Sequence, residues 1–192
     1  TKLTPEKVTG LLVAGVSGPQ APVLVPLKTH SRAMPSLLTI GVPVIFQLRS
    51  GTAVTNTGGT ITNNGSTLNV TGGTVITGGA VSIVGAGTML LSNSTIEGGT
   101  LSNSATGVIT TSGSSAITSI ITNALGGQSI SPAGAGGSGL TVGAGTHTND
   151  GSIVLNGLGN AESLYVNGSV PLSGTGTVTL NGTNNGIRGV GG

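Results

Sequence analysis

The amino-acid sequence predicts an all-β protein, a right-handed parallel β-helix with three short strands in each coil of about twenty residues. Its composition excludes an ordinary mixed core, since glycine accounts for 37 of the 192 residues, charged residues for 5% and aromatic residues for 1%. Threonine, valine and isoleucine, which favour extended backbone, are frequent among the other residues. Aliphatic residues also return at a constant spacing along the chain.

A repeat of twenty residues aligns the segments 55–62, 75–82, 95–102 and 115–122. Gly-Gly pairs at 58–59, 78–79 and 98–99 stand in register, and we expect them at corners, where positive φ and close approach of coils favour glycine. Side chains alternate along a strand, so one aliphatic residue per coil should point inward while Thr60 and Thr62 point outward. These inward residues form a predicted core column: Ile61, Val81, Leu101 and Ile121.

Other fold classes fit less well. A helical body is disfavoured because each glycine costs about 1 kcal/mol relative to alanine in a helix, and the apolar clusters lack the 3.6-residue period. Disorder is disfavoured because the mean hydropathy is positive and apolar residues are evenly spread. An up-and-down β-sandwich remains an alternative, since short alternating strands suit it too, although its spacing need not hold at twenty.

Residues 1–50 differ from the rest and are predicted to form a basic, proline-rich N-terminal anchoring arm or cap on a β-helix body at 51–192. The arm contains six of the eight prolines and a net charge of +4, whereas the body has a net charge of −2. Thr4 followed by Pro5 predicts the start of one short helix. We expect 37–48 to be a first strand or a cap, with Phe46 covering apolar edges. The predicted partner-anchoring residues are Lys2, Lys7, Lys28, Arg32 and Arg49.

Beyond residue 122 the repeat loosens. Glycine-rich residues at 124–147 predict a longer loop that leaves the coil, and strands are expected to resume at 153–155, 164–166, 170–172 and 178–180. No run reaches the ~20 apolar residues that span a bilayer, and neither apolar run resembles a secretory signal, so we expect no membrane insertion.

The chemistry-bearing residues predict no catalytic, cofactor or metal site. The chain has no cysteine, which excludes disulfides and thiolate sites. Glu97, Asp150 and Glu162 are too widely spaced for the paired carboxylates of a glycosidase, and Tyr165 is the only aromatic residue of the body. His147 lies near Asp150 and could present an imidazole with a carboxylate, but the Asn-Asp-Gly that follows is typical of a turn, and a metal needs three or four ligands.

Hydroxyl residues at 60, 62, 100 and 102, with the matching positions 80, 82, 120 and 122, should stack on one flat face. This arrangement resembles the T-x-T stripes of ice-binding β-solenoids, although Ala80 and Ile120 interrupt one stripe and serine replaces threonine in the other. Outward threonine is also simply a good strand former. Ice binding is therefore a second alternative function.

The body resembles the Gly/Thr/Asn repeats of filamentous-haemagglutinin-like exoproteins, autotransporter passengers and phage fibre or decoration proteins. The stretch 170–187, with its G-T-G-T-V-T-L and N-N-x-I pattern, carries the resemblance. It implies a non-enzymatic structural surface protein, first of all a virion decoration, cement or fibre protein anchored by its N-terminal arm. The alternative is a fragment of a secreted bacterial β-helical adhesin at the cell surface.

The expected partners are other structural proteins of a capsid or envelope surface. Docking on an acidic protein surface suits the basic arm better than nucleic acid, because its five cations are not interleaved with aromatic residues. A narrow β-helix with few charges also gains from burying one flank, so we expect a homo-oligomer, with a trimer as one arrangement.

Overall fold

The structure, a computed structural model, describes residues 12–14, 25–27, 32–33, 37–41, 45–49, 51–124, 128–132, 138–157 and 161–190. These residues form twenty-four strands and no helix. The strands make three sheets of eight, named sheets A, B and C. Among the residues described, none belongs to a helix of the length and apolarity that crossing a bilayer requires.

Sheet A contains, in spatial order, β1 (Leu12–Ala14), β4 (Leu37–Ile40), β7 (Thr60–Asn64), β10 (Ala80–Val84), β13 (Thr100–Asn103), β16 (Ile120–Asn123), β19 (His147–Asn149) and β22 (Leu172–Ser173). Sheet B contains β2 (Val25–Leu27), β5 (Ile45–Leu48), β8 (Thr67–Thr71), β11 (Thr88–Ser92), β14 (Val108–Ser112), β17 (Gln128–Pro132), β20 (Ser152–Asn156) and β23 (Thr177–Asn181). Sheet C contains β3 (Arg32–Ala33), β6 (Ala53–Thr55), β9 (Val75–Thr77), β12 (Thr95–Glu97), β15 (Ser114–Ile117), β18 (Gly139–Val142), β21 (Ser163–Val166) and β24 (Gly186–Gly189).

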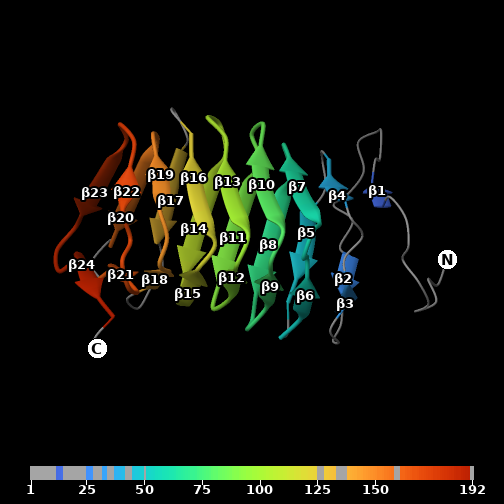
Figure 1. The fold of residues 1–192 in the computed structure, drawn as a ribbon, viewed down its shortest axis with the longest axis horizontal. Coiled ribbons are helices and arrows are strands. Elements are labelled where there is room, and N and C mark those ends of the chain that lie inside the picture. Colours follow the sequence, from blue (N-terminus) through green and yellow to red (C-terminus); the bar gives the residue numbers. More distant parts are fainter. Residues whose placement is uncertain are drawn as a thin grey trace.

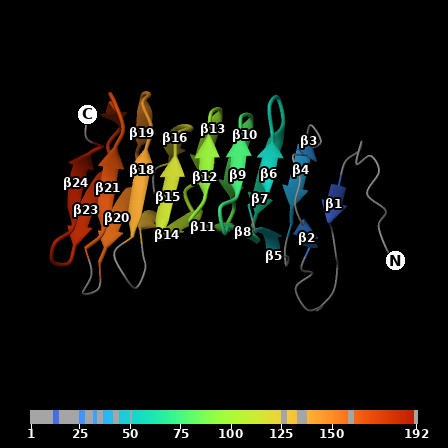
Figure 2. The same ribbon diagram turned by 90° about the horizontal axis from the view of Figure 1, so that it is seen from below.

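The chain winds from sheet A to sheet B to sheet C and then begins the next coil. Each strand therefore pairs with the strands three before and three after it, and every pairing is parallel, as between β7 and β10 or between β8 and β11. Figures 1 and 2 show the resulting rod, with the coils stacked in sequence order from the blue end to the red end. The predicted parallel β-helix is thus confirmed.

The predicted core column lies on the inner face of sheet A. Val81 pairs with Ile61 on one side and with Leu101 on the other, and Leu101 pairs with Ile121. All four side chains are buried. Because a fully buried aliphatic side chain contributes about 1.5–3 kcal/mol, the column is a principal source of stability along the rod.

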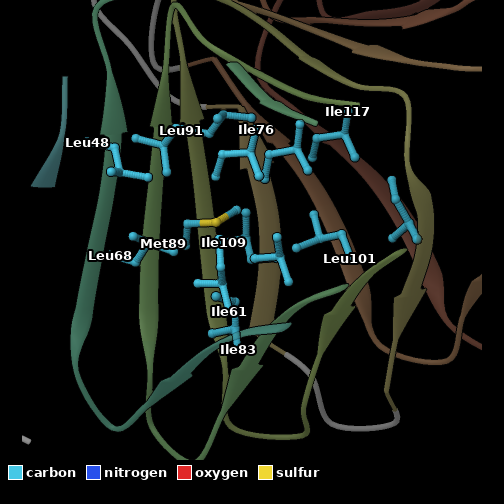
Figure 3. Packing of buried hydrophobic residues seen from close by; sticks show 14 of the residues in the cluster. Leu48, Ile61, Leu68, Ile76, Ile83, Met89, Leu91, Leu101, Ile109 and Ile117 are labelled. Atoms are coloured by element: carbon cyan, nitrogen blue, oxygen red, sulfur yellow. The ribbon is translucent and has the colours of Figure 1, made fainter. Parts of the chain in front are cut away.

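Sheets B and C supply matching inner columns. Leu68, Met89 and Ile109 follow one another on neighbouring strands of sheet B, as Figure 3 shows. Ile76, on sheet C, is likewise buried and pairs with Ile96. One apolar cluster joins the three sheets, so each coil is held by the coils above and below it.

The three sheets begin before Ser50. Strands β1 to β5 pair within them, and Leu38 and Phe46 are buried next to Ile61 and Leu68. Strands do form within 37–48, as β4 and β5, but the expectation of a first strand or a cap is wrong, because β1 to β3 precede them in the same sheets. Phe46 lies between Val25 and Leu68 in sheet B instead of covering an end. The helix predicted from Thr4 lies outside the described residues.

The Gly-Gly pairs stack at a corner of the rod, as predicted. Gly79 and Gly99 have φ of +64° and +62°, a region that side chains disfavour. A Cβ on Gly99 would collide with the carbonyl oxygen of Gly79, which accepts a hydrogen bond from the N–H of Thr100 at 2.9 Å. Glycine is therefore required there both by conformation and by the close approach of two coils.

The predicted loop at 124–147 is wrong in part, because β17, β18 and the start of β19 lie within it and continue all three sheets. The register shifts between Val108 and Ile109, where β14 meets β17. Strands do resume in β20, β21 and β23, whereas the one expected at 170–172 is limited to β22. Strand β24 was not expected, since its sequence is mostly glycine and polar residues.

Candidate functional site

His147 lies in the interior and not in a turn with Asp150. It is the first residue of β19 and follows Ile121 in the core column, where it is 1% exposed. Its Nδ1 accepts a hydrogen bond from the N–H of Ile121 at 3.0 Å, and Nε2 lies 3.0 Å from the carbonyl oxygen of Gly143. Because Nδ1 is an acceptor, Nε2 carries the hydrogen and donates to Gly143.

Asp150 links its own coil to the next one at the surface of the rod. Its Oδ1 accepts hydrogen bonds from the N–H of Thr175 at 2.9 Å and from the Oγ1 of Thr175 at 3.3 Å. The imidazole of His147 is thus committed to main-chain partners inside the column, while the carboxylate of Asp150 fixes the neighbouring coil. The two groups do not form the paired site that the sequence raised as a possibility.

The other two carboxylates of the body lie in contrasting places. Glu97, on β12, accepts a hydrogen bond from Thr77 Oγ1 at 2.8 Å on the outer face of sheet C. Glu162 is fully buried, and its Oε2 accepts the N–H of Ser138 at 3.0 Å, while Oε1 has no hydrogen-bond partner. Burial raises the pKa of Glu162, and the hydrogen bond from Ser138 partly offsets this rise.

These groups do not converge. Within the described ranges, no three His, Cys, Asp or Glu side chains lie close enough together to hold a metal ion. The arrangement therefore offers isolated polar groups, each with a structural contact.

The outer face of sheet A presents a regular row of polar side chains. Its strands align one outward hydroxyl per coil, and we name this set the hydroxyl column: Thr39, Thr62, Ser82, Ser102, Thr122, Thr148 and Ser173. Ser102 Oγ donates to Ser82 Oγ at 3.0 Å, and Thr148 Oγ1 lies 3.4 Å from Ser173 Oγ. The strands that carry these residues lie about 4.8 Å apart, and neighbouring side chains can bring their hydroxyls closer than that.

The sequence repeat identified only the middle of this column. Thr39 and Thr148 are offset from their neighbours by 23 and 26 residues, so a fixed spacing of twenty misses them. The adjacent outward column is mixed, as predicted, since Thr60 and Thr100 alternate with Ala80 and Ile120.

A buried asparagine ladder was also missed by the sequence reasoning. Asn103 Nδ2 donates to Asn123 Oδ1 at 2.9 Å, and Asn123 Nδ2 donates to Asn149 Oδ1 at 2.8 Å. The three side chains occupy equivalent inward positions at the end of β13, β16 and β19. Asparagine at 103 and 123 does follow the twenty-residue repeat, which was the available signal.

Two of the five predicted anchoring residues fall within the described residues. Arg49 is exposed directly after β5, and Arg32 belongs to β3 at the register position of Val54. Lys2, Lys7 and Lys28 lie outside the described residues, and the anchoring role of all five stays a prediction.

No protein-family model, curated protein or solved structure matches this chain.

Proposed function

We propose that this chain is a non-enzymatic structural protein, a rod that projects from the surface of a larger assembly, in the first place a virion. One observation carries the proposal: three parallel sheets of eight strands each run along the rod, and one buried apolar cluster joins them. Hydrogen bonds between coils run along the rod, so bending it requires many of them to lengthen together. Such a solenoid suits a stiff spacer or a decoration.

The distribution of charge supports attachment by one end. Residues 1–50 have a net charge of +4, and residues 51–192 have a net charge of −2. Such an asymmetry orients a rod toward an acidic surface, because opposite charges steer association while like charges oppose it. The basic end is the proposed anchor, and the β-helix stands outward from it.

The first test of this proposal determines where the protein is located. Antibodies against the β-helix are applied to virus particles, cell envelope and culture medium of the source, followed by immunogold labelling of the positive fraction. Labelled rods on virus particles support the proposal. Detection in the envelope or medium, as part of a much longer polypeptide, would replace it with the secreted adhesin, and a purely intracellular signal would overturn both.

The anchor is tested on the same particles. Replacing Lys2, Lys7, Lys28, Arg32 and Arg49 by glutamate should abolish binding to particles stripped of this protein, and replacing the three lysines by arginine should preserve it. Equal binding of the glutamate variant would show that the basic end is not the anchor.

Ice binding is a second candidate function, favoured by the uninterrupted hydroxyl column of sheet A. A row of outward hydroxyl residues on neighbouring strands is the kind of surface that could order water. Thermal hysteresis that is lost in Thr62→Tyr and Thr122→Tyr, within the hydroxyl column, but kept in Thr110→Tyr on the outer face of sheet B, would support this function. Absence of hysteresis in the unaltered protein would exclude it.

A further inference from the structure

Five asparagines of the chain are followed directly by glycine. Such a pair is chemically labile, because glycine has no side chain to keep its main-chain nitrogen away from Cγ of the asparagine before it. The reaction requires the glycine N–H to lose its proton and the asparagine amide to turn toward the nitrogen. The pairs are 64–65, 156–157, 167–168, 181–182 and 185–186.

Hydrogen bonds decide which of these pairs can react. A bond that holds either the glycine N–H or the asparagine amide must break before the two groups meet, so the reaction then waits for local opening of the fold. The five pairs share the same two residue types, and the sequence alone does not rank them. Their contacts in the β-helix do.

The pairs 64–65 and 185–186 are held through the main chain. The N–H of Gly65 donates to the carbonyl oxygen of Val84 at 3.1 Å, and the N–H of Gly186 donates to that of Glu162 at 3.0 Å. The side-chain amide of Asn185 also donates to two main-chain carbonyl oxygens, at 2.9 Å each. Neither pair can react without breaking a contact of the fold.

The pairs 156–157 and 181–182 hold each other. Asn181 Nδ2 donates to Asn156 Oδ1 at 2.9 Å, so one bond fixes both side-chain amides. Gly157 is also buried, away from the water that would take its proton.

The pair 167–168 has neither restraint. Asn167 follows β21 directly, and both residues of the pair are exposed. Within the part of the chain that the structure describes, the side chain of Asn167 and the N–H of Gly168 have no hydrogen-bond partner. The flanking main chain is fixed, since the N–H of Asn167 donates to the carbonyl oxygen of Val142 at 2.9 Å and that of Ser169 accepts the N–H of Gly145 at 3.1 Å.

We propose that Asn167 is a site of spontaneous deamidation in the folded protein and that the fold protects the other four asparagines. The nitrogen of Gly168 gives its proton to water and attacks Cγ of Asn167. The bond from Cγ to Nδ2 breaks, and ammonia leaves with a proton taken from water, so a succinimide ring forms. Water then opens the ring at either carbonyl and yields aspartate or isoaspartate. The net change is water taken up and ammonia released, with no oxidation or reduction.

The product alters a corner of the rod. Either form places a carboxylate where the chain had a neutral amide. Isoaspartate also routes the main chain through Cβ and Cγ, which lengthens it between the two hydrogen bonds that flank the pair. We therefore expect the amide of Gly145 to exchange its hydrogen faster in the isoaspartyl product.

The test follows all five pairs in one sample. The full chain is kept at mildly alkaline pH in heavy-oxygen water and digested, and its peptides are analysed by mass spectrometry. In the folded protein Asn167 should take up heavy oxygen at least ~10-fold faster than each other asparagine, because those react only after local opening. In urea the five should react at similar rates. Equal rates in the folded protein, or a faster reaction at another pair, would overturn the proposal.

Two glutamine variants assign the charge that appears. Glutamine must close a larger ring and reacts far more slowly, and at 167 it replaces a side chain with no contact to lose. Isoelectric focusing of the folded chain should show acidic species that grow with time in the unaltered protein and in the matched control Asn64→Gln, but not in Asn167→Gln. Circular dichroism checks that both variants are folded. Equal growth of acidic species in Asn167→Gln would place the reaction elsewhere and overturn the proposal.

Discussion

The N–H of Ile121 donates to Nδ1 of His147, 3.0 Å away, inside a column that is otherwise aliphatic. At this position the imidazole takes the place of the main-chain carbonyl of the next coil, which accepts this hydrogen bond at other positions of the column. The same ring donates through Nε2 to the carbonyl oxygen of Gly143. One imidazole thus satisfies two main-chain groups where the spacing between coils lengthens to 26 residues.

Replacement of His147 by leucine should therefore destabilise the protein although leucine suits the column. Two buried main-chain groups would lose their partners, at a cost of about 1–3 kcal/mol each, against a smaller gain from apolar burial. We expect a net loss of ~2 kcal/mol in the free energy of unfolding in urea, with faster hydrogen exchange at the amide of Ile121. The mildest variant should be His147→Gln, whose amide can both accept and donate. Equal protection of Ile121 in the leucine variant would contradict this role.

Alanine substitutions at three glycines distinguish the cost of backbone strain from the cost of a collision between coils. Gly41→Ala introduces neither and should change the free energy of unfolding by less than ~0.5 kcal/mol. Gly58, at φ +72° with open space around it, should cost about 1–2 kcal/mol as alanine. Gly99→Ala adds a collision with the Gly79 carbonyl and should cost about 1–3 kcal/mol more. Chemical denaturation of the three variants measures the order, and a Gly99 variant as stable as the Gly58 variant would refute the close-approach argument.

The strands and the core column could be predicted from the sequence wherever neighbouring coils have equal length. Ile61, Val81 and Leu101 could be aligned because no insertion separates their coils, and side-chain alternation then placed them inward. The column could not be followed to His147, because extra residues between β16 and β19 break the spacing. A buried histidine also carries no mark that distinguishes it from an exposed one in sequence.

The candidate site was predictable to a similar extent. Outward hydroxyls at 62, 82 and 102 follow from the repeat, whereas Thr39 and Ser173 join the column only through pairing between coils of other lengths. The burial of Glu162 could not be foreseen, since carboxylates are rarely buried without a partner and nothing adjacent in sequence provides one.

A charged residue at the centre of the asparagine ladder should destabilise the fold. In Asn123→Asp a carboxylate oxygen would replace the Nδ2 that donates to Asn149 Oδ1 at 2.8 Å and would face that acceptor, so in this ladder the buried charge would keep only the hydrogen bond from Asn103 Nδ2. We expect a loss of ~3–5 kcal/mol in the free energy of unfolding at neutral pH. The matched control is Asn181→Asp, because Asn181 Nδ2 donates to Asn156 Oδ1 at 2.9 Å on the exposed face of β23. Urea denaturation should show a loss below ~1 kcal/mol for this control. Similar losses in the two variants would mean that burial of the ladder contributes little.

The stability of the protein should depend on pH through Glu162. Burial raises the pKa of this carboxyl in the fold more than the hydrogen bond from Ser138 lowers it, so the folded protein holds the proton more tightly than the unfolded chain. The free energy of unfolding then falls as pH rises from the ordinary carboxyl pKa to the raised value, and the loss persists above it. Unfolding in urea at a series of pH values measures this slope.

Glu162→Gln removes the titrating group and keeps the shape of the side chain. An amide oxygen can still accept the N–H of Ser138, as Oε2 does at 3.0 Å, and no charge is buried. The variant should therefore lose the fall in stability over that pH range and be more stable than the unaltered protein at neutral pH. Glu97→Gln, at the exposed contact with Thr77, is the control and should leave the slope in place. A slope that persists in Glu162→Gln would assign the pH dependence to another group, because the buried carboxyl would then have contributed nothing to it.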